Sequence, residues 1–476
     1  MVRNWIVLAL AALVSALQPA AAETYYAAPI GAVFAGTPNG TIDHPFLSVA
    51  LAFASGKIVA GDTLLLMDGD YAALQLTQSF ASTVTIQSQN TRKARVESIY
   101  LSGAAHNLLI RNLRVWYSIA TTRSNNLVET SSTTSDITFA NLDVRSGVDA
   151  YNYESWSAAE WLARRSNGAW LNGTRVIIKQ SNFTAVGFGI LVVGTDGQAL
   201  GNTVDGFSAD GMRGGAPRGI FRDNIIQNCV SVDDNHADGF QSYSTGTVTG
   251  LVLERNMFIE WNLAPSHPLR CGLQGIGIFD GFHENVTITN NVVAIRNGHG
   301  ISIMGLRNAL INNNTVVNID GIQPGYPWIA VYNSKTGVQS TDVIVANNLA
   351  MAYAGANDKV NRIQFINNRV VRSVSHAYPD WQTFNYAPRP ETRFIDAADP
   401  LYAPELDVLR HPRPIGAGPD LGAYEVSSLA LPEALSDTVI SPPAEVSAAG
   451  DLAEAAASTT STTAKTTSSA KFLKAP

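Results

Sequence analysis

Five short runs in the middle of the chain share a glycine followed by apolar residues: FGILVVG, DGMRGG, DGFQSYS, QGIGIFDG and HGISIMG. The residues just before the glycine are Phe188, Asp210, Asp238, Gln274 and His299. Those two places after it are Leu191, Arg213, Gln241, Gly277 and Ser302. If the runs are strands that stack about 4.8 Å apart, each set forms a column on one wall of the protein. The sequence therefore predicts a strip of acids, amides, histidine and arginine on a single surface.

Asp210 and Asp238 would lie one strand apart on this strip. Two neighbouring carboxyl groups repel each other as anions, so they share a proton or a cation. Paired carboxyls perform glycoside hydrolysis, and clustered ones also hold calcium. The alternative is that aspartate before glycine simply makes good turns.

Histidine and arginine complete the predicted catalytic set. His236 and His299 can take or give a proton near neutral pH. Arg213 and Arg270 can each form a forked contact with a substrate carboxylate, or pair with the nearby aspartates.

Two loops of the repeat are expanded beside this strip, and long loops on a rigid scaffold commonly carry binding groups. They read VDDNHAD and WNLAPSHPLRC. We expect them to wall a cleft whose substrate-binding residues are Gln241, Trp261, Arg270 and Gln274. Asp233 and Asp234 are candidate calcium ligands or a solvated loop. Whether Cys229 and Cys271 pair is left open by the sequence.

A further insertion, DAYNYESWSAAEWLARRSNGAW, is rich in aromatic residues. Flat aromatic faces pack against sugar rings, which makes Trp156 and Trp161 candidates for a saccharide platform. The alternative is a short helix, SAAEWLARR, whose aromatic residues cover one face of the scaffold.

The elements that must position these residues repeat along the chain. Short runs of β-branched residues, such as VTITNNVV, alternate with period two, which indicates strands. Each contains an asparagine, and these are Asn112, Asn141, Asn182, Asn202, Asn224, Asn256, Asn291, Asn314, Asn348 and Asn368. Asparagine tolerates the left-handed backbone that a sharp bend needs, and stacked amides can form a ladder. The shortest spacings are 20 residues (182 to 202, 348 to 368), which excludes the blades of about 40 residues in a β-propeller.

Over roughly residues 24–425 this pattern resembles the right-handed parallel β-helix family of pectate-lyase-like proteins. The resemblance implies an all-β solenoid with an N-terminal capping helix near residues 46–57. GPDLGAYE near residue 418 is similar to the family's C-terminal closure. A cap is physically required because an open end exposes apolar core and unpaired strand edges.

The same resemblance implies two mechanisms. In β-helix polysaccharide lyases and epimerases, arginine or calcium neutralises a uronate carboxylate and a base removes the C5 proton. Here Arg213 or Arg270 would neutralise, His299 or His236 would carry the proton, and the aspartates would orient them or bind calcium. GHGISIMG and HADG also resemble motifs of polygalacturonase-type hydrolases, which implies an inverting hydrolase as the second reading. A glycan-binding or structural β-helix without activity is the third.

The composition and the two ends of the chain limit the possible partners, location and domain organisation of the protein. Hydrophobic residues make up 46% of the chain, which favours a well-buried core. The net charge of −7 argues against nucleic acid as a partner. Residues 1–22 read as a signal peptide, cleaved near Ala22, so we expect a secreted or periplasmic protein without membrane insertion. Residues 23–425 form the predicted β-helix domain, and the Ala/Ser/Thr/Pro-rich residues 426–476 a disordered tail. We expect a monomer that acts on an acidic polysaccharide, with calcium as the one candidate cofactor.

Overall fold

The computed structural model describes residues 21–118, 126–242, 244–321, 325–355 and 357–427. These belong to one unit, residues 1–430. Nearly all of the predicted signal peptide and tail lies outside the described residues. Within the described ranges, no helix has the length and apolar character needed to cross a membrane.

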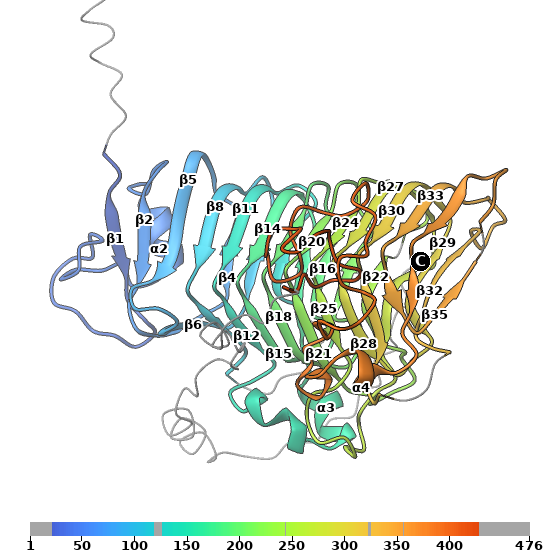
Figure 1. Cartoon of the computed structure of the whole chain (residues 1–476). Helices are drawn as coiled ribbons and strands as arrows, with labels where there is room; N and C mark the ends of the chain where they lie inside the picture. The colour runs from blue at the N-terminus through green and yellow to red at the C-terminus, as the bar shows by residue number, and fades with distance from the viewer. Residues whose placement is uncertain (1–20, 119–125, 243, 322–324, 356, 428–476) are drawn as a thin grey trace, which may run out of the picture. The chain divides into compact units, whose positions relative to one another are not determined.

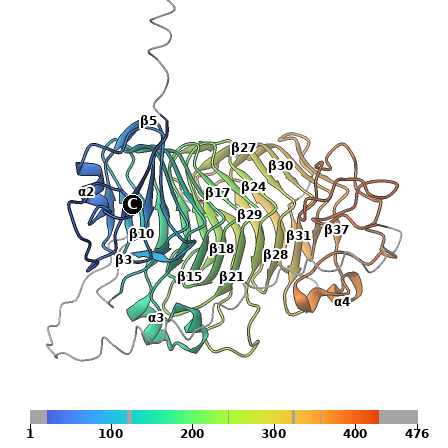
Figure 2. The same ribbon diagram turned by 90° about the vertical axis from the view of Figure 1, so that its left-hand side faces the viewer.

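The chain is a right-handed parallel β-helix (Figures 1 and 2). Successive strands enter three all-parallel sheets in turn, and each strand pairs with its equivalent one coil later. The 14-stranded sheet contains β1 (Thr24–Ala27), β2 (Thr63–Leu66), β5 (Ser79–Ser88), β8 (His106–Arg111), β11 (Ser135–Ala140), β14 (Thr174–Lys179), β17 (Gln198–Leu200), β20 (Ile220–Arg222), β23 (Thr247–Thr249), β24 (Val252–Glu254), β27 (Phe282–Thr289), β30 (Leu306–Asn312), β33 (Thr341–Ala346) and β36 (Ile363–Ile366).

The other two sheets complete the coils. The 12-stranded sheet contains β3 (Gly69–Tyr71), β6 (Ala94–Val96), β9 (Arg114–Val115), β12 (Asp143–Arg145), β15 (Asn182–Val186), β18 (Thr203–Phe207), β21 (Ile225–Cys229), β25 (Met257–Ile259), β28 (Val292–Ile295), β31 (Thr315–Asn318), β34 (Leu349–Ala350) and β37 (Arg369–Val370). The 11-stranded sheet contains β4 (Leu74–Leu76), β7 (Ile99–Leu101), β10 (Asn126–Thr130), β13 (Asn167–Leu171), β16 (Ile190–Val192), β19 (Met212–Gly214), β22 (Asp238–Ser242), β26 (Gln274–Ile278), β29 (His299–Met304), β32 (Trp328–Tyr332) and β35 (Ala352–Ala354).

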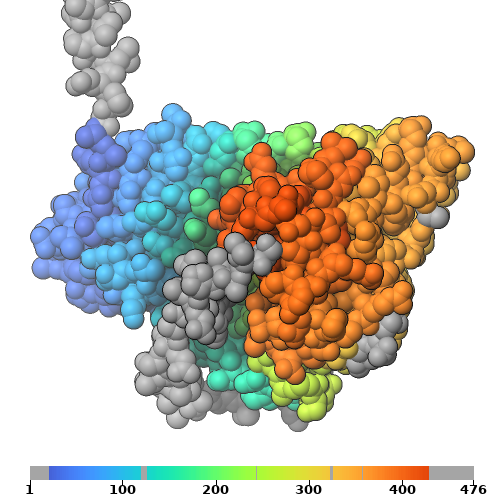
Figure 3. Space-filling view, in the orientation of Figure 1, coloured from blue at the N-terminus to red at the C-terminus, as the bar shows by residue number. Residues whose placement is uncertain are grey.

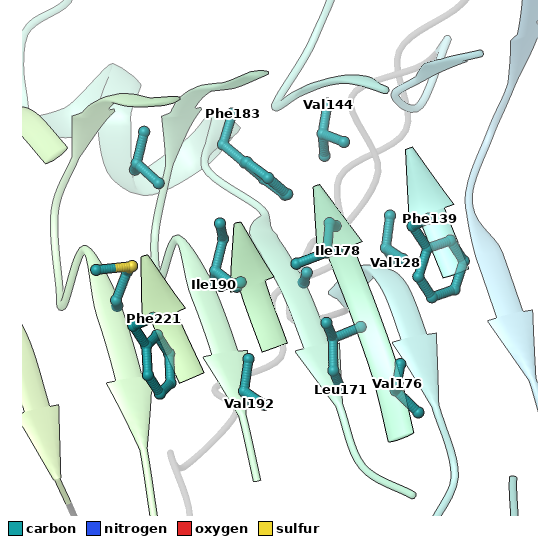
Figure 4. Packing of buried hydrophobic residues seen from close by; sticks show 14 of the residues in the cluster. Val128, Phe139, Val144, Leu171, Val176, Ile178, Phe183, Ile190, Val192 and Phe221 are labelled. Atoms are coloured by element: carbon teal, nitrogen blue, oxygen red, sulfur yellow. The ribbon is translucent and has the colours of Figure 1, made fainter. Parts of the chain in front are cut away.

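The interior of the coils is filled by aliphatic and phenylalanine side chains from all three sheets. Figure 4 shows side chains such as Val176, Ile178, Phe183, Ile190 and Val192 pointing into this space. They come from alternate positions of their strands, because side chains of a strand point to opposite faces in turn. The alternating pattern in the sequence thus becomes a continuous core.

The asparagines fill two neighbouring positions at the corner between the 14-stranded and 12-stranded sheets. From Asn202 onward the predicted residues form a buried amide ladder: the backbone N–H and side-chain Nδ2 of Asn224 both donate to Oδ1 of Asn256, at 3.1 and 2.9 Å. The ladder continues through Asn291, Asn314, Asn348 and Asn368.

The left-handed bend falls on the residue before each ladder asparagine. Asp223, Arg255, Asn290, Asn313 and Asn347 all have φ between 50 and 59°. Of the ten predicted asparagines, only Asn112 and Asn141 take the left-handed backbone themselves, and Asn182 follows Ser181, which occupies the ladder position. The left-handed bend and the amide ladder, which were both predicted for the same asparagine, are therefore provided by two adjacent residues.

The predicted N-terminal capping helix is confirmed as α2 (Val49–Ala54). Ser48 caps it by accepting a hydrogen bond from the Leu51 N–H at 3.1 Å. Val49 and Ala52 are its buried residues. The helix therefore turns its apolar side to the solenoid core, as a cap must.

The predicted C-terminal closure is corrected. The segment after β37, which contains α4 (Val374–Ala377) and the 3-10 helix η3 (Trp381–Thr383), packs sideways on the outer face of the 12-stranded sheet. Tyr378, Tyr386, Leu421 and Tyr424 join a buried cluster with residues of β25, β28, β31 and β34. In Figure 3 this orange and red segment covers the side of the coils. The outer face of these strands carries apolar side chains such as Val292, Ala294 and Val317, and the C-terminal segment covers them.

Candidate functional site

The predicted strip lies on the 11-stranded sheet. Arg213 pairs with Leu191 on one side and Gln241 on the other, and Gln241 pairs with Gly277, which pairs with Ser302. These five residues therefore form one row across adjacent strands. At the strand entrances, Asp238 pairs with Gln274, and the Gly211 N–H donates to the Asp238 carbonyl at 2.8 Å.

The two aspartates are buried, which the sequence did not predict. Asp210 is 1% exposed and Asp238 is fully buried. Arg213 grips Asp210 with both Nε, at 2.8 Å, and Nη2, and the Asp238 N–H donates to the other carboxylate oxygen of Asp210 at 3.2 Å. Burial raises the pKa of Asp210, while Arg213 and the Asp238 N–H oppose this shift.

Asp238 has the most perturbed environment of the strip. Burial, and then the charge of Asp210, raise the pKa of Asp238 to about 8, against the opposing effect of Arg213. Its Oδ2 lies 3.2 Å from His236 Nδ1 and 3.4 Å from Gln241 Nε2. Its Oδ1 has no hydrogen-bond partner among the described residues. Perturbed carboxyls of this kind are typical of sites that move protons.

His236 connects this buried carboxyl to the outside. Its side chain is 65% exposed, although its Nδ1 contacts a fully buried group. The VDDNHAD loop thus places an accessible imidazole directly on the buried acid. His236, Asp238, Asp210 and Arg213 form one connected chain of ionisable groups. It is here called the proton-transfer cluster, after the role that is proposed for it below.

His299 lies farther along the same sheet in an aromatic setting. Its ring contacts Phe279 and Trp328 edge to face, with centroids 5.5 and 5.2 Å apart. Its Nδ1 lies 3.0 Å from Ser302 Oγ, and the Trp328 indole N–H also donates to that oxygen at 3.0 Å. Burial lowers the pKa of His299, which favours the neutral ring. The sequence analysis missed Phe279 and Trp328, because the strand of Trp328 lacks the glycine that marked the other runs.

The saccharide platform predicted for Trp156 and Trp161 does not fit the structure. Both are buried, and they pack edge to face on each other at 5.4 Å. Trp161 belongs to α3 (Ala158–Arg164), which follows the 3-10 helix η2 (Ala150–Ser155). Trp261, predicted to line the cleft, is buried in the same cluster. These aromatic residues hold the inserted loops together, as in the alternative reading, so their faces are not available to a ligand.

Arg270 is likewise unavailable to a substrate. It is nearly buried and pairs with Glu260 at 3.0 Å and Asp320 at 2.9 Å. Arg296 also pairs with Glu260, at 2.5 Å, so this network braces the second loop. Gln274, by contrast, keeps a partly exposed side chain beside Asp238.

Two of the carboxylates predicted as calcium ligands are bound by arginine side chains. Asp233 pairs with Arg165 at 2.7 Å, and Asp210 is held by Arg213. Within the described residues, no group of three or more His, Cys, Asp or Glu side chains is arranged to hold a metal ion. A calcium site at Asp233 and Asp234 therefore stays a prediction.

Cys229 and Cys271 form a disulfide with a Cα–Cα distance of 5.5 Å. It joins the end of β21 to the residues that precede β26, so it ties together the two ends of the segment that carries His236 and Asp238. Two hollows lie away from the proton-transfer cluster. One, of about 490 Å³, is bordered by Tyr332 and Phe365, and the other, of about 460 Å³, by Asp280 and Lys335, which pair at 2.8 Å.

Comparisons with known proteins give structural likeness only. No family model and no curated relative matches the sequence. Among solved structures, pectate lyase Pel9A is 16% identical, with a TM-score of 0.46 over 86% of this chain and 97% of that one. The A-module of mannuronan C-5 epimerase AlgE6 from Azotobacter vinelandii is 13% identical, with a TM-score of 0.45 over 68% and 87%. A mannuronic acid specific family 6 lyase from human gut microbiota is 15% identical, with a TM-score of 0.39 over 73% and 85%. The reaction must be argued from this chain's own residues, but its three parallel sheets make it a right-handed parallel β-helix protein.

Proposed function

We propose that this chain is an exported enzyme that acts on a uronate-containing polysaccharide by removing the C5 proton, as a lyase or an epimerase. The observation that carries the proposal is the contact between the accessible imidazole of His236 and the fully buried carboxyl of Asp238. The disulfide supports export, because such bonds persist in oxidising compartments.

The proton-transfer cluster can supply His236 Nε2 as a base, and its availability depends on whether Asp238 is protonated. When Asp238 is ionised, its Oδ2 accepts the Nδ1–H of His236, which leaves the Nε2 lone pair free. When Asp238 is protonated, it donates to Nδ1, and Nε2 then carries the hydrogen. Since the pKa of Asp238 is raised to about 8, the base is available mainly in mildly alkaline solution.

Arg213 is the group suited to the substrate carboxylate. Its side chain is one-quarter exposed, and its guanidinium carbon lies 4.8 Å from the centre of the Phe188 ring, while Asp210 binds the guanidinium. A cation beside the uronate carboxylate stabilises the negative charge that develops when the C5 proton leaves. Gln241 stands next to Arg213 in the row, but it is buried and its Nε2 donates to Asp238. Gln274, which pairs with Asp238 and is partly exposed, can donate hydrogen bonds to sugar hydroxyls.

The proton balance then allows two outcomes. His236 Nε2 takes the proton from C5. In a lyase, the electron pair forms the C4–C5 double bond, the bond from C4 to the glycosidic oxygen breaks, and that oxygen receives the proton. In an epimerase, C5 regains a proton on its opposite face, and the neutral imidazole of His299 is the candidate second carrier.

The inverting hydrolase is less well supported. That mechanism needs two carboxyls that reach the glycosidic bond and a water between them. Asp210 and Asp238 are both buried, and Asp210 is occupied by Arg213. His236, rather than either carboxyl, is the group that can meet a substrate.

The deciding experiment incubates the purified mature chain at pH 9 with polymers of galacturonate, mannuronate and guluronate, and with polymers that alternate a uronate with a neutral sugar. Ultraviolet absorbance from an unsaturated uronate identifies a lyase, and deuterium uptake at C5 in heavy water identifies an epimerase. His236→Ala should abolish either signal, while His376→Ala, at an exposed site on α4, should not. New reducing ends without absorbance would indicate the hydrolase, and binding without any reaction would indicate a glycan-binding protein.

A further inference from the structure

The row of outward side chains continues beyond Arg213 toward the N-terminal coils. Arg213 pairs with Leu191, Leu191 with Trp170, Trp170 with Glu129 and Glu129 with Tyr100. With strands about 4.8 Å apart, Trp170 lies about 10 Å and Tyr100 about 19 Å from the Arg213 position. The row thus extends in a straight line from the proton-transfer cluster.

Trp170 and Tyr100 are exposed at these places, unlike the buried tryptophans of the inserted loops. Trp170 is 37% exposed and Tyr100 is 40% exposed. Neither the Trp170 indole N–H nor the Tyr100 hydroxyl has a hydrogen-bond partner within the described part of the chain. Large amphipathic rings that leave their polar atoms free are suited to contacts with a ligand that is apolar on its faces and polar on its edges. A sugar ring has this character.

Glu129 lies between the two rings, one strand from each. Its Oε2 accepts a hydrogen bond from Asn126 Nδ2 at 2.9 Å, which fixes the carboxyl on its strand. A carboxylate accepts hydrogen bonds from sugar hydroxyls but repels the carboxylate of a uronate. The charge at this place is therefore opposite to that at Arg213.

We infer that Tyr100, Glu129 and Trp170 form a subsite for a neutral, hydroxyl-bearing sugar of the same polysaccharide chain whose uronate lies at Arg213. The inference rests on the proposed function for the identity of that polysaccharide. It specifies a substrate with both acidic and neutral sugars, rather than a pure polyuronate.

The test measures binding separately from turnover, with His236→Ala as the background. The probes are an alternating galacturonate–rhamnose polymer and a galacturonate homopolymer, compared by affinity electrophoresis and calorimetry. The background should bind the alternating polymer more tightly. Trp170→Ala and Tyr100→Ala should each weaken this binding about tenfold, which corresponds to about 1.4 kcal/mol. Glu129→Gln should tighten binding of the homopolymer.

Two further variants separate ring contact from disturbance of the fold. Trp170→Phe keeps a flat ring and should retain most of the affinity. Tyr332→Ala removes a similarly exposed tyrosine on β32, outside the row, and should leave binding unchanged. Binding of both polymers that does not depend on Trp170, or the absence of binding, would overturn the subsite. Wild-type turnover by His236→Ala would instead overturn the proposed reaction and leave the binding result intact.

Discussion

A β-carbon at Gly277 would lie 3.0 Å from Oδ1 of Asp238 and would collide with the ring of Phe279. Gly277 stands next to Gln241 in the row, and the lack of a side chain there makes room for both the buried carboxyl and the ring that contacts His299. One glycine thus affects the surroundings of both Asp238 and His299, the two groups proposed to carry protons.

Gly277→Ala should therefore impair both activity and stability. The ring and the carboxyl must shift, so we expect turnover to fall at least about tenfold, while overpacking destabilises the fold by about 1–3 kcal/mol. Gly272→Ala is the matched control, because a β-carbon there meets no atom within 4 Å. Equal activity of the two variants would show that the space over Asp238 is not needed.

The pH profile should report the proton-transfer cluster. Since Asp238 has its pKa raised to about 8, kcat/KM should rise with pH through about 8 as the His236 base becomes available. Asp238→Asn should remove this limb of the profile, and a limb that persists in the variant would assign it to another group.

Stability should fall in acid because of His283. It is buried, its Nε2 lies 2.7 Å from Ser242 Oγ, and burial lowers the pKa of His283 to about 4. An unfolded histidine titrates near pH 6.5, so the native state binds fewer protons between these values. The stability that neutral, buried His283 contributes to the fold is fully present above about pH 6.5 and is lost as the pH falls through about 4. Tm measured from pH 7 to 4 should decline less steeply in His283→Gln than in the wild type.

The disulfide should stabilise the loop that carries His236. Its two cysteines are 42 residues apart, and closing a loop of this length contributes about 2–4 kcal/mol. The double variant Cys229→Ser/Cys271→Ser should melt several degrees lower, and reductant should lower the Tm of the wild type but not of the variant. A wild type that is insensitive to reductant would contradict this role.

The amide ladder should contribute measurably to the stability of the central coils. Asn256 accepts from Asn224 and donates to Phe221 O and Asn291 Oδ1, all in the interior. Asn256→Leu leaves these partners unsatisfied, and each buried unpaired group costs about 1–3 kcal/mol. Denaturant unfolding of this variant should show that the free energy of unfolding falls by roughly 3 kcal/mol or more. Asn152→Leu, at an exposed position, should change the free energy of unfolding little.

Local patterns in the sequence determined the architecture. The period-two alternation placed Arg213, Gln241, Gly277 and Ser302 in one row, and the structure pairs them so, because strand register repeats from coil to coil. The capping helix near residues 46–57 was implied by the resemblance to the β-helix family, and the structure has it at Val49–Ala54. The roles of the strip residues in catalysis and binding stay predictions.

Only the tertiary structure decided what is exposed on that architecture. Asp210 and Asp238 are buried, and Trp156, Trp161 and Trp261 lie in one buried cluster. Arg270 is paired with Glu260 and Asp320. These arrangements depend on contacts between segments that are distant in the sequence. The sideways course of the C-terminal segment likewise follows from an apolar sheet face built by many coils. The spacing of residues along the chain does not show which inserted loop covers which side chain. Yet this burial by other segments raises the pKa of Asp238, and its absence leaves Trp170 exposed.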